Sequence, residues 1–195
     1  MRKLLLTALA FASFATASAQ DEKTAGFTNG DVFISGNVGF SSEKFGERKE
    51  NSFTVAPRVG FFVSENIAIG GKLGFTSQKE ELGSTEDKTN AFSVGAFGRY
   101  YFSPASKFSV FGEFGADYRS TNQDNGTTDV TNNGFGIGGG PGVSYFIGNN
   151  FALEAFWGAL RYATEKADTD GAESQDNFDL NVNLEDITLG LVYKF

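Results

Sequence analysis

Apolar and polar residues alternate along most of the chain, in runs of about ten residues that are separated by polar stretches. An alternation of period two places successive side chains on opposite faces of an extended strand. No helical period competes with it over these runs. The sequence therefore predicts about eight strands, at residues 32–40, 53–61, 67–76, 92–102, 108–119, 134–145, 151–158 and 186–195.

The connections between these runs alternate in length. Four are long, polar and charged, at residues 41–50, 77–88, 120–133 and 164–177, whereas those at 64–66, 103–107 and 148–150 are short. Long loops on one rim and short turns on the other are typical of an up-and-down antiparallel barrel. Pro57 and Pro141 fall inside predicted strands, where each removes a ladder donor, so we expect bulges there.

The aromatic residues of the apolar face indicate that this face points outward, into lipid. They gather at both ends of the strands, as expected for belts at the two membrane interfaces. A soluble carrier barrel would instead turn its apolar face inward. The predicted belt near the long loops comprises Phe40, Phe53, Phe75, Phe92, Tyr118 and Phe135. The belt near the short turns comprises Phe61, Phe102, Phe108, Tyr145 and Phe151.

The opposite face carries charges of both signs among glycines, which suits a narrow polar lumen. Opposite charges can neutralise one another there, and glycines leave room for long side chains. Eight residues form the predicted charge network of the lumen: Arg58, Lys72, Arg99, Glu113, Asp117, Glu154, Asp186 and Lys194.

The N-terminus has the three parts of a secretory signal. Arg2 and Lys3 form the charged start, residues 4–16 form an apolar run, and residues 17–19 form a small-x-small cleavage pattern before Gln20. The predicted organisation is a signal peptide at residues 1–19, a short periplasmic segment at 20–30 and a barrel domain at 31–195.

Composition excludes much of enzyme chemistry. The chain has 25 glycines and 22 phenylalanines but no cysteine and no histidine. It can therefore form neither a disulfide framework nor a Cys/His zinc site, and it lacks the base of a Ser-His-Asp triad. The net charge of −8 argues against a nucleic-acid partner. We expect no catalytic residue and no cofactor.

Two patterns that could bind ligands are interpreted as structural. Gly134, Gly136 and Gly139 fit G-x-G-x-x-G, but no helix follows them, as a dinucleotide site would require. The acidic residues of the last long loop lack EF-hand spacing, and a solvated loop is the favoured interpretation; the alternative is weak bridging of Ca²⁺ or Mg²⁺ to lipopolysaccharide. These residues are Asp168, Asp170, Glu173 and Asp176. We expect no metal site.

Two segments resemble bacterial outer-membrane β-barrel domain proteins of the OmpA/OmpX-like kind. Residues 61–70 (FFVSENIAIG) resemble their strand–turn–strand signature, and residues 189–195 (LGLVYKF) resemble their terminal strand. The resemblance implies an all-β transmembrane barrel, located in the outer membrane among lipid and lipopolysaccharide and inserted by the barrel-assembly machinery. The expected assembly signal comprises Leu189, Leu191, Tyr193 and Phe195.

Three hypotheses for function follow. The first is a small closed barrel, monomeric and non-enzymatic, that supports the envelope or binds a surface ligand through its long loops. The second is a narrow channel or porin, although about eight strands enclose only enough space for side chains. The third is a secreted lipocalin-like carrier.

Overall fold

The computed structural model describes residues 25–83, 85–169, 171–180 and 187–195. The predicted signal peptide and Asp186 lie outside the described residues. No helix in the described part of the chain is long and apolar enough to span a membrane. The strands are β1 (Val32–Phe45), β2 (Arg48–Phe62), β3 (Ile67–Leu82), β4 (Thr85–Tyr101), β5 (Phe108–Asp124), β6 (Asp129–Phe146), β7 (Phe151–Trp157), β8 (Leu160–Ala167), β9 (Ser174–Leu180) and β10 (Ile187–Lys194).

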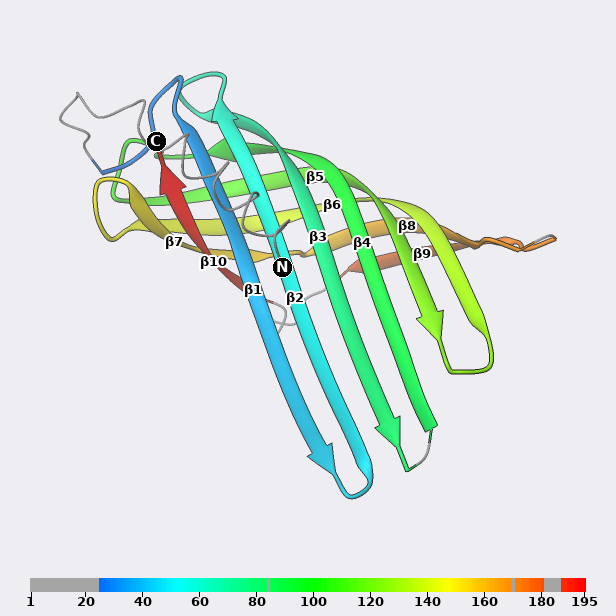
Figure 1. Cartoon of the computed structure of the whole chain (residues 1–195). Coiled ribbons are helices and arrows are strands. Elements are labelled where there is room, and N and C mark those ends of the chain that lie inside the picture. The colour runs from blue at the N-terminus through cyan, green and yellow to red at the C-terminus, as the bar shows by residue number, and fades with distance from the viewer. Residues whose placement is uncertain (1–24, 84, 170, 181–186) are drawn as a thin grey trace, which may run out of the picture.

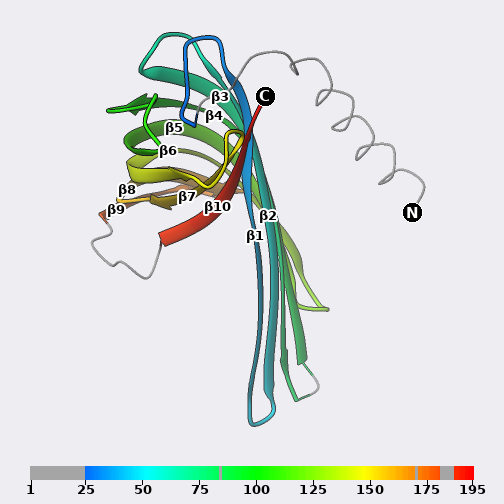
Figure 2. The same ribbon diagram turned by 90° about the vertical axis from the view of Figure 1, so that its left-hand side faces the viewer.

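The strands close into one antiparallel barrel (Figures 1 and 2). β1 to β6 pair in sequence order, and β10 closes the ring by pairing with β1 on one side and β7 on the other. β7 and β8 pair with successive parts of β6, so they act as one barrel strand. In the same way, β9 pairs with β8 and β10 pairs with β7, so β9 and β10 together act as the eighth barrel strand. The predicted eight-stranded barrel is confirmed.

The seam that closes the barrel is short. The described pairing of β1 with β10 extends from Phe33, opposite Lys194, to Gly36, opposite Leu191. These residues lie at the short-turn end, where the C-terminus also lies (Figure 1). From Asn37 onward, the described partner of β1 is β2 alone. The seam therefore depends on a few backbone pairs.

The prediction of four long loops is wrong, because most of the residues assigned to these loops extend the strands. β1 and β2 remain paired to Phe45 and Arg48, and β3 and β4 remain paired to Leu82 and Thr85. The other two loops likewise contain the outer ends of β5, β6, β8 and β9. Figure 2 shows β1–β4 continuing beyond the barrel as one sheet. The reason is that both faces are polar there, so the apolar alternation stops although the backbone pairing continues.

The two prolines inside strands affect the sheet differently. Pro57 leaves a gap in the β2–β3 ladder, which resumes at Arg58 in the same register, so no bulge forms. Opposite Pro141 the register does shift. Gly139 pairs with Leu160, whereas Gly142 pairs with Phe156, so the partner strand accommodates one extra residue at residues 157–159. The bulge expected near Pro141 therefore lies on the neighbouring strand.

Phenylalanine rings fill the lumen by lying over glycines of the neighbouring strand. Phe33 pairs with Gly60 and Phe111 with Gly142. A Cβ atom on either glycine would overlap the ring of its partner. Both phenylalanines are fully buried. This arrangement explains why the sequence is rich in both residue types: the glycine provides the space that the ring occupies.

Candidate functional site in the barrel lumen

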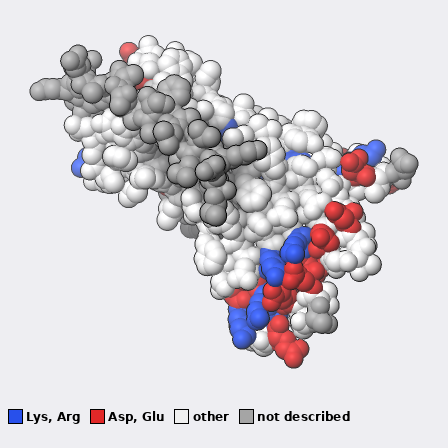
Figure 3. Space-filling model, viewed as in Figure 1, with Lys and Arg blue, Asp and Glu red and all other residues white. Residues whose placement is uncertain are grey.

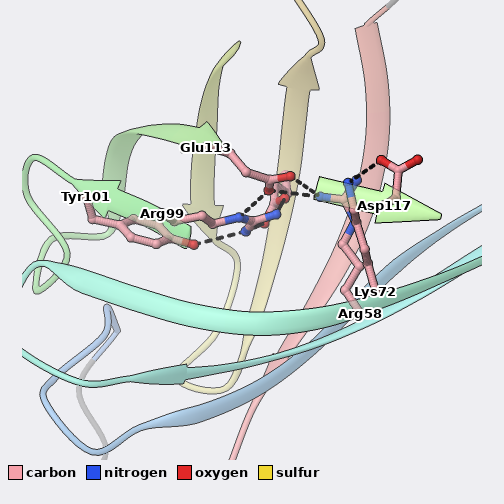
Figure 4. A network of polar contacts seen from close by, with 7 residues as sticks. Arg58, Lys72, Arg99, Tyr101, Glu113 and Asp117 are labelled. Atoms are coloured by element: carbon pink, nitrogen blue, oxygen red, sulfur yellow. Dashed lines mark hydrogen bonds and ion pairs between the residues drawn. The ribbon is translucent and has the colours of Figure 1, made fainter. Parts of the chain in front are cut away.

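Arg99 lies at the centre of the lumen and links two carboxylates from different strands. Its side chain is 0% exposed. Arg99 Nε donates to Glu113 Oε2 at 2.6 Å, while its two terminal nitrogens donate to the two oxygens of Glu154 at 2.9 and 2.8 Å. Arg99 also donates to the hydroxyl of Tyr101 at 3.1 Å. Figure 4 shows this guanidinium between the tyrosine ring and the Glu113 carboxylate. The bidentate geometry fixes β4, β5 and β7 relative to one another.

Arg58 completes this layer from β2. Its Nη1 donates to both oxygens of Glu113, at 3.1 and 2.9 Å. Two arginines and two glutamates thus form a neutral group whose buried charges are mutually compensated. Phenylalanine rings surround it: the guanidinium carbon of Arg99 lies 4.5 Å from the Phe111 ring centroid and 5.0 Å from that of Phe97. We call Arg58, Arg99, Glu113 and Glu154 the central layer.

A second group lies nearer the hairpins. Lys72 donates to Asp117 Oδ1 at 3.2 Å, and Arg161 donates to both oxygens of Asp117 at 3.2 and 3.0 Å. The Arg161 side chain is 38% exposed and that of Lys72 is 22% exposed. Water therefore reaches this end of the lumen. In the central layer the Arg99 side chain is fully buried, whereas that of Arg58 is 17% exposed.

The N-terminal segment packs into the mouth of the barrel at the short-turn end. Phe27 is buried against Phe62 and Phe146, with ring centroids 4.8 and 4.9 Å apart. The Phe27 N–H donates to the Pro104 carbonyl at 2.7 Å. Gly26 has a φ of 113°, and a Cβ there would collide with the backbone of Ala105. The described part of the predicted short periplasmic segment therefore helps to close this mouth.

The predicted network residues separate into three places. Arg58, Arg99, Glu113 and Glu154 meet in the central layer, and Lys72 meets Asp117 in the second group. Lys194 lies at the mouth, where its Nζ is 3.5 Å from Asp31 Oδ2 and donates to the Gly26 carbonyl. Asp186 lies outside the described residues.

Sequence reasoning missed three residues that contribute here. Arg161 was missed because the extra residue at 157–159 exchanges the inner and outer positions of β8 relative to β7. Tyr101 falls on the same face as Arg99 by the alternation of its strand, but nothing in the pattern marks it as a hydrogen-bond partner of Arg99. Phe27 precedes the first alternating run, so the strand pattern carried no signal for it.

The residues assigned to the aromatic belts lie on the outward face. Phe40 and Phe135 are 76% and 66% exposed, and nearly all of the rest are exposed as well. Tyr118 is half-buried, and its hydroxyl donates to Asn133 at 2.9 Å. The C-terminal residues are also on this face: Leu189 and Leu191 are exposed, and the Tyr193 ring contacts both Phe151 and Phe195.

The acidic residues of the fourth predicted loop do not form one cluster in the described part of the chain. Asp176 belongs to β9, where it pairs with Thr164, whereas Asp168 follows β8. Asp170 lies outside the described residues. No group of three or more potential metal ligands occurs among the described residues.

Chemically, the central layer acts as a crosslink. Each carboxylate already accepts hydrogen bonds from an arginine, and the Phe111 ring packs against the Arg99 guanidinium. The layer joins four of the eight barrel strands across the lumen, so it resists the separation of the strands.

Comparison with known proteins places this geometry among outer-membrane barrels. The family model described as "Outer membrane protein beta-barrel domain" matches residues 6–195. No curated protein matches the chain.

Solved structures of small barrels are similar in fold. OprG from Pseudomonas aeruginosa is 13% identical, with a TM-score of 0.56, covering 88% of this chain and 99% of that one. Outer membrane protein W of E. coli is 17% identical with a TM-score of 0.51, covering 86% and 99%. Neisserial surface protein A is 18% identical with a TM-score of 0.50, covering 84% and 97%.

Proposed function

Because the chain belongs to the family of outer membrane protein β-barrel domains, we propose that it is a closed, non-enzymatic barrel that supports the bacterial outer membrane and presents its hairpins for binding outside the cell. The observation that carries this proposal is the central layer. Arg99 is fully buried and held by two carboxylates. Such a group fills the lumen instead of lining a channel.

Two further features support a closed barrel. An eight-stranded barrel has an interior just wide enough for side chains. The mouth at the short-turn end is filled by an aromatic cluster, in which Phe27 contacts Phe33, Phe62, Tyr101 and Phe146. A solute would have to displace both this cluster and the central layer.

The orientation follows from the connections. Outer-membrane barrels have short periplasmic turns and longer extracellular connections. The paired hairpins formed by β1–β2 and β3–β4 therefore project outside, and the mouth containing Phe27 faces the periplasm. The two aromatic belts mark the membrane interfaces, and residues 1–19 act as the export signal. The hairpins take the binding role that the sequence had assigned to loops.

The alternatives are less well supported. A secreted carrier is contradicted by the outward apolar face and by the outer-membrane family. A narrow channel finds some support in the exposure of Arg161 and Lys72, which admits water to the outer half of the lumen. The central layer nevertheless separates that half from the periplasmic mouth.

The test is conduction by the purified full-length barrel. We expect no stable conductance in planar bilayers and no swelling of liposomes in small sugars, whereas liposomes containing a general porin swell under the same conditions. Stable nanosiemens channels from a verified monomer would overturn the closed-barrel proposal. Folding is checked by heat-modifiable gel migration.

A further inference from the structure

The outward face of β1–β4 repeats one pattern on every strand. An aromatic residue is followed, two positions further from the barrel, by serine or asparagine, and two positions further still by lysine. The four sets are Phe40, Ser42 and Lys44 on β1; Phe53, Asn51 and Lys49 on β2; Phe75, Ser77 and Lys79 on β3; and Phe92, Asn90 and Lys88 on β4. Because side chains alternate along a strand, each set shares one face.

The strand register brings these lysines into direct opposition. Lys44 pairs with Lys49, and Lys79 pairs with Lys88. Like charges directly opposite each other destabilise an antiparallel pair. Figure 3 shows charged side chains gathered over the outer ends of these strands, below a wall that is almost free of charge. We call Lys44, Lys49, Lys79 and Lys88 the lysine row.

Two carboxylates only partly neutralise the lysine row. Glu81 lies 3.5 Å from Lys49 and 2.8 Å from Lys79. Glu86 lies 2.7 Å from both Lys79 and Lys88. In these described ion pairs, four lysines thus share two glutamates, so the lysine row has two more charges than the carboxylates that contact it. The side chains of Lys49 and Lys88 are 51% and 52% exposed, so their ammonium groups can take a further partner.

The inner face of the same hairpins has the opposite sign. It carries four acidic residues and one arginine: Glu43, Glu50, Glu80, Asp87 and Arg48. The whole chain is also acidic, at −8. Within the hairpins of β1–β4, positive charge is therefore concentrated on the outward face, which looks toward the surrounding membrane.

The height of the lysine row matches the headgroups of the outer leaflet. Each lysine lies four residues beyond the aromatic residue of its strand, which is about 10 Å along the barrel axis at a tilt near 40°. The interfacial region outside the hydrocarbon core is roughly 5–8 Å thick on each side. A flexible lysine stem can reach back toward that region. Basic groups at this height attract anionic lipids.

We propose that the lysine row binds phosphate groups on the lipid headgroups of the outer leaflet. Glu86 already bridges Lys79 and Lys88, so the phosphate fits best between Lys44 and Lys49, where it replaces their repulsion with ion pairs. The inference rests on the proposed orientation, in which the hairpins project outside the cell.

The test compares two lipids on the same protein. The full barrel, folded in detergent micelles, is titrated with bisphosphorylated lipid A and with the same lipid lacking both phosphates, and bound lipid is counted by native mass spectrometry. We expect at least about tenfold tighter binding of the phosphorylated lipid, weakening as salt is raised. Equal binding of the two lipids by the parent protein would overturn the proposal without need of any variant.

A matched pair of variants tests the location. Lys44→Gln, Lys49→Gln and Lys88→Gln together remove three charges but retain Lys79, which makes short ion pairs with both Glu81 and Glu86. The control removes three charges elsewhere, by Arg48→Gln, Lys107→Gln and Arg119→Gln. We expect loss of the lipid preference in the first variant, retention in the control, and rescue when the same three lysines become arginine. Retention in the first variant would overturn the assignment.

Two further readouts separate the possible causes. Inorganic phosphate at the lipid concentration should not displace the lipid, and full displacement would identify phosphate alone as the ligand and overturn the lipid assignment. The conductance of the barrel is independent of the lysine row. A failed lipid test with a non-conducting barrel would therefore overturn this inference and leave the closed barrel intact.

Discussion

Arg99 is buried at the centre of the lumen, where a guanidinium is tolerated only when its donors are satisfied. Its bonds to Glu113, Glu154 and Tyr101 use both sides of the planar fork. Lysine could not replace Arg99. An ammonium group lacks the planar geometry that makes two parallel hydrogen bonds to one carboxylate and a third hydrogen bond to another carboxylate.

We predict that Arg99→Met lowers the free energy of unfolding by about 3–5 kcal/mol, the usual cost of breaking a buried pair by removing one partner. The described ion pairs of Glu154 are with Arg99, whereas Glu113 also has Arg58. Adding Glu154→Gln to this variant should therefore restore part of the loss. The measurement is urea unfolding of the protein in lipid vesicles. A loss below about 1 kcal/mol would show that the layer is not structural.

At this scale the sequence predicts the face of a side chain but not its partner. Alternation placed Arg58, Arg99, Glu113 and Glu154 in the lumen. It could not assign Arg58 to Glu113, which is 55 residues away, because a period of two carries no information on height across the barrel. Lys194 illustrates the same limit: it faces inward, yet its ion pair at the mouth is with Asp31.

The hairpin extensions of β1–β4 show how a strand can continue without an apolar face. There the strands are held together by cross-strand backbone hydrogen bonds and by ion pairs such as Arg48–Glu80, at 2.8 Å, and not by an apolar face in contact with lipid. The sequence predicted the eight strands well where one face meets lipid. It failed beyond the membrane, because charged residues on both faces resemble a loop when only hydrophobicity is considered.

The ion pairs of the extension predict a dependence on pH. Hydrogen bonds from Lys79 lower the pKa of Glu81 and of Glu86 below the ordinary 4.5, and hydrogen bonds with these carboxylates raise the pKa of Lys79 to about 12. Because the folded-state pKa values of the glutamates are lowered, their contribution is complete above 4.5 and is lost as the pH falls through the lowered values.

We therefore expect the carboxyl carbons of Glu81 and Glu86 to titrate below pH 4.5 in an NMR series. Lys79→Gln is the control, because it removes the hydrogen bond that is the main cause for both residues and should move both midpoints back toward 4.5. Midpoints unchanged by this substitution would show that the ion pairs do not persist in solution.

The whole molecule is closed by parts that lie far apart in the sequence. The N-terminal segment fills the mouth at the short-turn end, and the last strand completes the ring at a seam of four described residue pairs. Phe195 extends that seam, because its N–H donates to the Val32 carbonyl at 2.9 Å and its ring packs edge-on against Tyr193.

Deletion of Phe195 should reduce folding into vesicles several-fold, since it removes one of the few bonds across the seam. Phe195→Ala keeps the backbone donor and should give an intermediate yield, which separates the contribution of the bond from that of the ring. The measurement is the heat-modifiable fraction after refolding. An unchanged yield for the deletion would contradict a role for this residue in closure.

The extra residue at 157–159 has a consequence at the level of the gene. One inserted or deleted codon within a strand moves every later side chain of that strand to the opposite face of the barrel wall. Residues that faced the lumen then face the lipid, and the reverse. The irregularity opposite Pro141 absorbs such a step locally and lets the guanidinium of Arg161 reach Asp117. Removing one codon there would direct Arg161 into lipid, at a cost of up to about 2–4 kcal/mol near the midplane. We therefore expect this wall to tolerate length changes of two residues, or of one residue at a bulge.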